Sequence, residues 1–164
     1  MVEAYENTRT NKIEAFEEAI DAYRSSGNRM GESAFLACLG ELFGRIGRLR
    51  DAHAAICRGL DYVNRSGEHF AEAELLRIKG NLHILEGEDT AAELAYSGSL
   101  AVSAAQNAKS WELRTLLAQA TSRPKAGDAI TSSLGATCEW FGNQSSLPEL
   151  AEANALLRVQ TNFQ

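Results

Sequence analysis

ESAFLACLGELFGRIG, residues 32–47, and EAELLRIKGNLHILEG, residues 72–87, align without a gap at a spacing of 40 residues. In both stretches apolar residues recur three and four positions apart, which is typical of an amphipathic helix. Both end on a glycine, the residue that most easily adopts the left-handed backbone that follows a helix. Self-similarity at a fixed period of this length indicates a helical repeat protein.

The same spacing extends over most of the 164 residues. The series are Glu32, Glu72 and Glu112; Leu36, Leu76 and Leu116; Gly40, Gly80 and Ala120; and Gly47, Gly87 and Gly127. We predict first helices at 29–45, 69–85 and 109–123, and second helices at 49–65, 89–105 and 129–142. Gly27, Gly67 and Asn107 would end the second helices. The pairs make three repeats, at about 29–66, 69–106 and 109–142, within a single domain of residues 1–164.

Further helices are predicted at the two ends of this array. A helix at 11–25 matches the second helix of a repeat whose first helix is absent, and Asn11 with Glu14 has the spacing of a capping box at its start. Thr90 and Glu93 have the same spacing inside the array. A closing helix at 147–159 would cap the other end. The sequence therefore predicts an all-α, right-handed solenoid with a leading half-repeat.

Glycines inside two first helices need their own explanation, because a glycine there costs about 1 kcal/mol relative to alanine. Gly40 and Gly80 occupy equivalent positions, so we expect a neighbouring helix to approach closely at this point. Ala52 and Ala92, also in register, would be the small residues that face them.

Composition excludes several classes of protein. Aromatic residues make up 7% of the chain and prolines number 2, which argues against a β-sandwich and against disorder. The net charge is −6 and the basic residues form no cluster, so neither nucleic acid nor an anionic membrane surface is an expected partner. The first ten residues lack the apolar run of a signal peptide and no long apolar span follows, so we expect a cytoplasmic protein.

These features resemble the tetratricopeptide-repeat (TPR) family. The matching positions are the small residue of the first helix, a ring three residues later (Phe43, His83), and the alanine early in the second helix (Ala52, Ala92). The period of 40 is longer than the 34 residues of TPR units, and the family's early tryptophan and its proline between repeats are missing. The segment 140–157 is similar to the closing segment of TPR-like regions at the C-termini of large bacterial signalling ATPase and cyclase-type regulators.

The resemblance implies a protein without catalytic activity that binds a protein or peptide as an adaptor or sensing module in bacterial signalling. The alternative is a small-molecule sensor domain of a transcriptional or signalling regulator. In TPR-like arrays the first helices line a concave groove, and the positions flanking their packed stripe would contact the partner. The groove residues predicted in this way are Glu41, Arg45, Glu74, Arg77, Asn81, Arg114 and Thr121.

Residues that could support catalysis or metal binding are sparse. No phosphate-binding glycine loop occurs. His53 and Cys57 are spaced i, i+4 on one helix and could supply two metal ligands, but no second pair accompanies them, so we expect neither a metal site nor a cofactor. The three cysteines, Cys38, Cys57 and Cys138, lie in predicted helices, and we expect them to be buried free thiols of a reducing compartment. We therefore do not expect an enzyme.

The leading half-repeat also predicts self-association. Its outer face has no preceding helical hairpin to cover it. A second chain covering this face would give a homodimer, through the apolar residues Ile13, Phe16, Ile20 and Tyr23.

Overall fold

Helices are the only regular structure over the residues that the computed structural model describes, which are 2–122, 128–142 and 146–161, with side chains described for 12–122, 128–142 and 146–159. The predicted all-α class is confirmed for this part of the chain. The helices are α1 (Val2–Ser25), α2 (Glu32–Arg45), α3 (Leu49–Ser66), α4 (Glu72–Glu86), α5 (Asp89–Ala105), α6 (Lys109–Ser122), α7 (Asp128–Phe141) and α8 (Pro148–Thr161).

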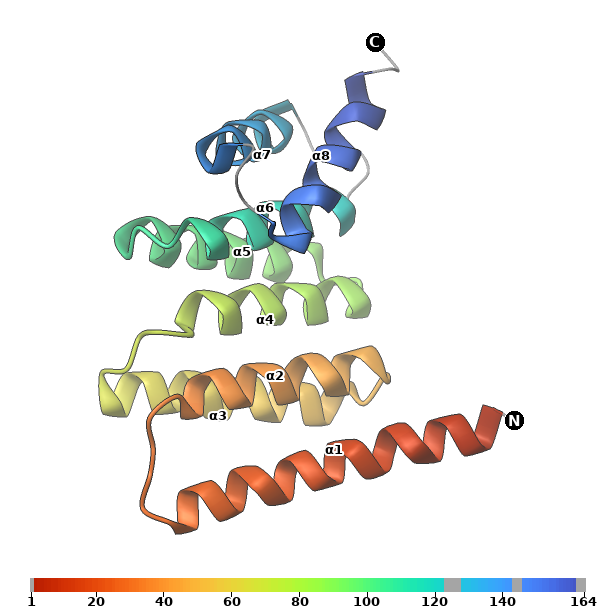
Figure 1. Cartoon of the computed structure of the whole chain (residues 1–164), viewed down its shortest axis with the longest axis vertical. Coiled ribbons are helices and arrows are strands. Elements are labelled where there is room, and N and C mark those ends of the chain that lie inside the picture. The colour runs from red at the N-terminus through yellow and green to blue at the C-terminus, as the bar shows by residue number, and fades with distance from the viewer. Residues whose placement is uncertain (1, 123–127, 143–145, 162–164) are drawn as a thin grey trace.

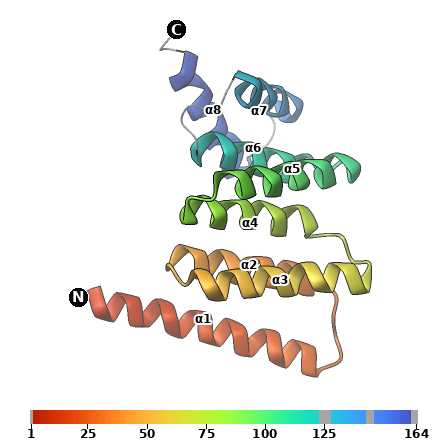
Figure 2. The same cartoon turned by 180° about the vertical axis from the view of Figure 1, so that it is seen from behind.

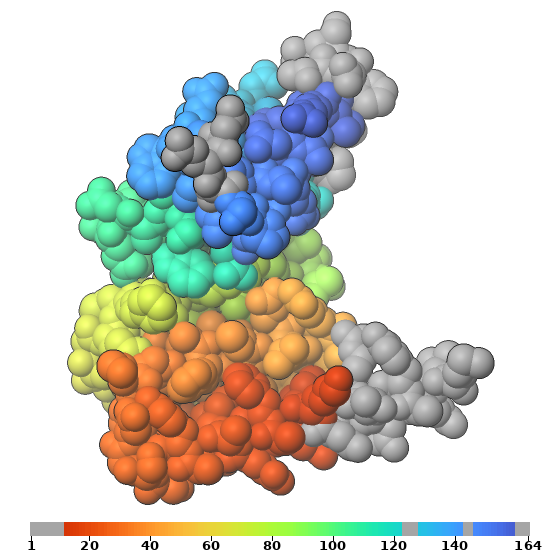
Figure 3. Space-filling view, viewed as in Figure 1, coloured from red at the N-terminus to blue at the C-terminus, as the bar shows by residue number. Residues whose placement is uncertain are grey.

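The helices are stacked along the long axis of the molecule, from α1 at one end to α7 and α8 at the other (Figures 1 and 2). The most extensive contacts join α2 to α3 and α4 to α5. In addition α2, α4 and α6 contact one another in order, so these three helices form a continuous layer. Side chains fill the space between successive helices, and the bands of colour in Figure 3 follow chain order.

Most of the predicted helix boundaries agree with the structure to within three residues, but the predicted start of the helix at 11–25 and two predicted capping boxes are wrong. α1 begins at Val2, so Asn11 lies inside the helix and does not cap it. α5 begins at Asp89 after Glu88, and no side-chain hydrogen bond caps its start, so Thr90 and Glu93 do not form a capping box. Both pairs have the right spacing, but neighbouring residues extend the helix past them.

The turns between repeats have the predicted left-handed backbone. Gly67 has a φ of 72° after α3, and Asn107, the equivalent residue one repeat later, has a φ of 52° after α5. Asparagine is among the few residues with a side chain that tolerate this conformation, so it can replace glycine here. Gly127, which is predicted to end the first helix of the third repeat, lies outside the described residues.

The glycines inside α2 and α4 do mark close approaches, but the facing residues are large ones. A Cβ atom on Gly40 would lie 2.5 Å from Cδ1 of Ile56, and one on Gly80 would lie 2.5 Å from Cε1 of Tyr96. Ala52 and Ala92 are buried, and the carbonyl oxygen of Ala52 would lie 3.4 Å from the Cβ atom on Gly40, but the atoms nearest to the two glycines belong to Ile56 and Tyr96. The missing side chain makes room for a large one from the paired helix.

The apolar face of α1 packs on its own chain, which corrects the predicted position of the self-association residues. Ile13 and Ile20 are each 4% exposed and belong to the core formed with α2, α3 and α4, and Phe16 packs against it. The ring of Tyr23 meets that of Phe35 edge-on at 5.3 Å. These four residues form the inner face of α1, because the apolar stripe of this helix packs against the array.

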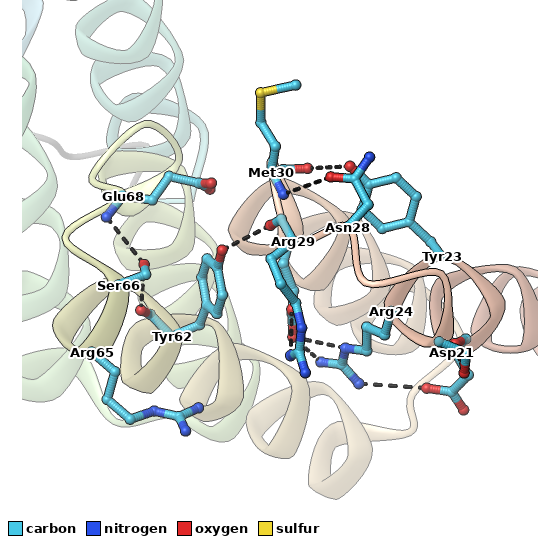
Figure 4. Close-up of polar contacts among 12 residues, drawn as sticks. Asp21, Tyr23, Arg24, Asn28, Arg29, Met30, Tyr62, Arg65, Ser66 and Glu68 are labelled. Atoms are coloured by element: carbon cyan, nitrogen blue, oxygen red, sulfur yellow. Dashed lines mark hydrogen bonds and ion pairs between the residues drawn. The ribbon is translucent and has the colours of Figure 1, made fainter.

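Side chains tie the loops between helices to one another along one edge of the molecule. Glu68, before α4, accepts hydrogen bonds from the backbone N–H of Gly31 (2.9 Å) and the hydroxyl of Ser33 (2.6 Å). The hydroxyl of Tyr62 donates to the carbonyl oxygen of Arg29 at 2.7 Å (Figure 4). One loop further on, the amide of Gln106 donates to the carbonyl oxygen of His69 at 2.8 Å. The loops before α2, α4 and α6 are therefore fastened together.

Candidate binding groove

Two adjoining hollows lie along the layer of α2, α4 and α6, near the C-terminal ends of these helices. The first, of about 310 Å³, lies between α2 and α4 and is lined by Glu41, Arg45 and Leu82 among others. The second, of about 320 Å³, lies between α4 and α6 and includes Tyr96 and Thr121. Both are lined by Asn81 and Leu85, so we treat them as one groove that crosses three helices.

Residues one turn apart on α4 form the wall that the two hollows share. Asn81 and Leu85 are spaced i, i+4, which places them on one face of the helix. The hydroxyl of Tyr96 donates to Oδ1 of Asn81 at 2.7 Å, so the amide nitrogen is the group of Asn81 that can donate to a bound chain. Leu85 is 61% exposed and presents its apolar surface at this wall.

A glycine sets the depth of the first hollow. A Cβ atom on Gly44 would lie 2.9 Å from Cδ2 of Leu82, so α2 and α4 approach one another more closely here than a side chain would allow. Gly44 also lines the hollow. The absent side chain thus serves both the packing of the two helices and the opening of the groove.

Beside the groove, charged side chains from four helices form a network of ion pairs. Arg77 donates from Nε and Nη2 to the two carboxylate oxygens of Glu74, at 2.8 Å each. Nη2 of Arg114 lies 2.7 Å from Oε1 of Glu74. Glu41 lies 3.4 Å from Nη2 of Arg77, and Glu149 of α8 lies 3.6 Å from Nε of Arg114. The network therefore joins α2, α4, α6 and α8.

The centre of this network is buried. The side chains of Arg77 and Glu74 are 7% and 8% exposed. Burial disfavours the Arg77 cation, but its hydrogen bonds to Glu74 and the negative charges of Glu74 and Glu41 outweigh burial and raise the pKa of Arg77 above its ordinary value. Arg77 thus stays charged, and its hydrogen-bonding groups face the carboxylate of Glu74.

The seven predicted groove residues fall into two groups. Glu41, Arg45, Asn81 and Thr121 line the two hollows. Glu74, Arg77 and Arg114 lie in the ion-pair network instead. The 40-residue register predicted all seven as partner contacts, but it could not distinguish residues that open onto the hollows from residues that bind one another across repeats, and Glu41 does both.

Sequence reasoning missed the contribution of α5 and of α8 to this site. Tyr96 reaches the second hollow from α5, over the backbone of Gly80, and Glu149 reaches the ion-pair network from α8. The glycine series was the signal that could have indicated Tyr96, since a large residue 16 positions later would fill the space. Nothing in the repeat predicts Glu149.

Cys138 is buried as predicted, but Cys38 and Cys57 are exposed. Neighbouring atoms still partly desolvate the thiol of Cys38, and together with the charges of Glu41 and Glu74 this raises its pKa, while burial raises the pKa of Cys138. A raised pKa lowers the fraction of reactive thiolate, so neither is activated as a nucleophile.

Comparison with known proteins gives no assignment. No family model, no curated protein and no solved structure matches the chain. Within the described residues, none of the helices combines the length and the apolar character that crossing a bilayer requires.

Proposed function

We propose that this chain is a non-catalytic scaffold that binds a protein or peptide segment in the groove across α2, α4 and α6. The proposal treats the fold as a right-handed, TPR-like solenoid with repeats at about 29–66, 69–106 and 109–142. Its support is the recurrence, 40 residues apart, of the contacts of Gly40 with Ile56 and of Gly80 with Tyr96, and the continuous layer of first helices. Solenoids commonly bind their partners along such a continuous layer.

The observation that carries the proposal is the continuity of the two hollows. They meet at Asn81 and Leu85, so a ligand that filled both would extend across three helices. An elongated chain matches this shape better than a compact one. A peptide in an extended or helical conformation could place successive side chains in the two hollows.

The chemistry of the groove defines the class of peptide. Leu82, Ile84 and Leu85 would pack against an aliphatic or aromatic side chain, and the amide of Asn81 would hydrogen-bond to the peptide. The neighbouring charges balance, with three arginines (Arg45, Arg77 and Arg114) against three glutamates (Glu41, Glu74 and Glu149). We therefore expect a partner of mixed composition, bound by apolar anchors, and weak dependence of the affinity on salt.

Selection of short random peptides on the immobilised chain tests this proposal, followed by affinity measurement with fluorescent peptides. Leu85→Asp places a charge in the apolar wall and is expected to weaken binding at least tenfold, about 1.4 kcal/mol. Leu94→Asp is the matched control, because Leu94 is 77% exposed on α5 and lines neither hollow. Selected peptides that bind the Leu85→Asp variant as tightly as the unaltered chain would refute the groove assignment.

The size of the hollows supports the alternative, a small-molecule sensor. Each is about 310–320 Å³, at the lower end of the range of about 300–1,000 Å³ that small-ligand sites occupy. Screening a fragment library by NMR would distinguish the two. Fragments that shift the amides of Asn81 and Leu85 and bind more tightly than any selected peptide would favour the sensor.

The cellular setting is part of the same proposal. A cytoplasmic adaptor or sensing module of a bacterial signalling system agrees with the net charge of −6. It also agrees with the exposed thiols of Cys38 and Cys57, which persist most easily in a reducing compartment. Homodimers remain a prediction, with an interface other than the inner face of α1. Light scattering on the purified chain would give its mass.

A further inference from the structure

Two of the three histidines come together with a glutamate between α3 and α4. His53 lies on α3, and His83 and Glu86 lie one turn apart near the end of α4. One ligand atom from each residue lies within 4.8 Å of the other two. The sequence offered His53 with Cys57 as a pair on one helix, whereas the structure groups His53 with residues of the next repeat.

The interatomic distances describe a tight cluster around one carboxylate. Oε2 of Glu86 lies 2.8 Å from Nε2 of His53 and 3.8 Å from Nδ1 of His83. The two imidazole rings have centroids 5.3 Å apart. Ligand atoms around a tetrahedral metal ion with bonds of about 2.0–2.1 Å lie somewhat more than 3 Å from one another. Small rotations of these side chains would therefore bring the three atoms to a common centre.

We propose that His53, His83 and Glu86 bind a divalent transition metal ion, with Zn²⁺ as the ion that this ligand set suits. Two imidazoles and one carboxylate are a common protein ligand set for zinc, and they leave a fourth position for water or for a group of a bound partner. Hard cations such as Mg²⁺ prefer oxygen ligands alone and are not expected to bind here.

The local backbone positions a second carboxylate beside the site. The N–H of Glu88 donates to the carbonyl oxygen of His83 at 2.8 Å, so the chain turns back over the last turn of α4 after Gly87. Oε2 of Glu88 lies 2.7 Å from Nδ1 of His83. Glu88 contacts the same Nδ1 atom of His83 that lies 3.8 Å from Glu86, so an ion bound at this nitrogen would replace its hydrogen bond with Glu88. The carboxylate of Glu88 would then lie beside the ion, where its negative charge favours a bound cation.

The end of α4 also favours a cation electrostatically. The last carbonyl groups of a helix carry a partial negative charge, and His83 and Glu86 belong to the last turn of α4. Since His53 comes from α3, an ion bound here would connect the two repeats. Binding would raise the melting temperature, because the ligands come together only in the folded chain.

Calorimetric titration of the tag-free full-length chain with ZnCl₂ tests the proposal. We expect one Zn²⁺ per chain and no heat from MgCl₂. His53→Ala and Glu86→Gln should each weaken Zn²⁺ binding about tenfold or more. Loss of a residue that only supports a metal ligand already costs about this much, and these variants remove a ligand itself. His69→Ala is the matched control, since His69 pairs with Glu72 outside the cluster. Cys57→Ser checks the thiol one turn from His53.

Melting temperature gives a second, independent readout. Zn²⁺ should raise it equally in the unaltered chain and in the His69→Ala variant, and should raise it less in the His53→Ala and Glu86→Gln variants. If binding persists undiminished in His53→Ala, or is lost in His69→Ala or Cys57→Ser instead, the assigned ligands are wrong. If the unaltered chain binds no Zn²⁺ at micromolar concentration, the histidines serve only as hydrogen-bond partners of Glu86 and Glu88.

Discussion

The ring of Tyr96 lies over the backbone of Gly80, with Cε1 only 2.5 Å from the place that a Cβ atom would occupy. Tyr96 is fully buried and its hydroxyl is fixed on Asn81, so the ring cannot move aside easily. This contact joins α4 to α5 and also supports the wall of the groove.

Alanine at position 80 should therefore destabilise the protein despite its higher helix propensity. Overpacking costs about 1–3 kcal/mol, against about 1 kcal/mol gained by replacing glycine in a helix, so we expect a net loss of about 1 kcal/mol. Chemical denaturation would measure it. Gly98→Ala is the control, because its Cβ would meet Leu76 at an ordinary 3.5 Å, and it should stabilise the chain. Equal effects at the two positions would contradict the close approach.

Replacing Glu74 should have a larger effect, because it leaves Arg77 as a buried cation with only the more distant Glu41 nearby. Breaking a buried pair by removing one partner costs about 3–5 kcal/mol, and we expect Glu74→Ala to approach the lower figure. The double variant Glu74→Leu with Arg77→Met should recover much of this loss, because it removes both charges together. Urea denaturation of the two variants and the unaltered chain checks this, and a double variant less stable than Glu74→Ala would contradict it.

Acidification should weaken the junction between α1 and α2 through Glu32. Burial disfavours its charged form, but hydrogen bonds from Arg24 and Arg29 outweigh burial and hold the pKa of Glu32 below its ordinary value of 4.5. The folded state therefore binds fewer protons than the unfolded state, and this contribution is present above pH 4.5 and is lost as the pH falls through the lowered pKa.

The measurement is the free energy of unfolding as a function of pH for Glu32→Gln. At neutral pH we expect a loss of about 2 kcal/mol, typical of hydrogen bonds to a charged group, and at acidic pH the variant and the unaltered chain should converge. Glu18→Gln, on the exposed face of α1, should change little at either pH. A constant difference between Glu32→Gln and the unaltered chain at every pH would show that the charge of Glu32 is not involved.

Substitution of Ile20 tests whether this residue packs inside one chain or at an interface with a second chain. Because Ile20 is 4% exposed in a single chain, Ile20→Ala should lower the free energy of unfolding by about 2–4 kcal/mol. Whatever the mass of the unaltered chain in light scattering, the folded variant should keep it. If the variant is as stable as the unaltered chain but has half its mass in light scattering, Ile20 lies at an interface between two chains, as the sequence predicted.

Local patterns in the sequence predicted the helices well. The 3.6-residue periodicity located the helices, and Gly67 and Asn107 adopt the left-handed backbone that the register required. These features depend on residues close together in the chain, whose preferences do not need the rest of the molecule. The predicted caps at Asn11 and Thr90 were wrong because a helix can continue past a residue that would favour a cap. Whether it continues is determined by packing against the rest of the molecule.

Contacts between repeats could not be predicted from the sequence. The burial of Arg77 and Glu74 depends on Arg114 and Glu149 arriving from later helices. The cluster of His53 with His83 depends on how α3 leans against α4, and a spacing of 30 residues does not correspond to the period of 40. The register therefore identified the face that carries the groove, while the partners of each side chain came from the three-dimensional arrangement.

The hydrogen bonds that fasten the loops before α2, α4 and α6 lie at one edge of the helical layer, and the groove lies toward the opposite ends of the same helices. Since these bonds hold the N-terminal ends of the three helices, a rotation about that edge changes the spacing between helices most at their C-terminal ends, within the limit that the ion pairs of Glu41, Arg77 and Arg114 set. A bound segment that bridges α2, α4 and α6 would restrict this rotation further and fix the width of the groove.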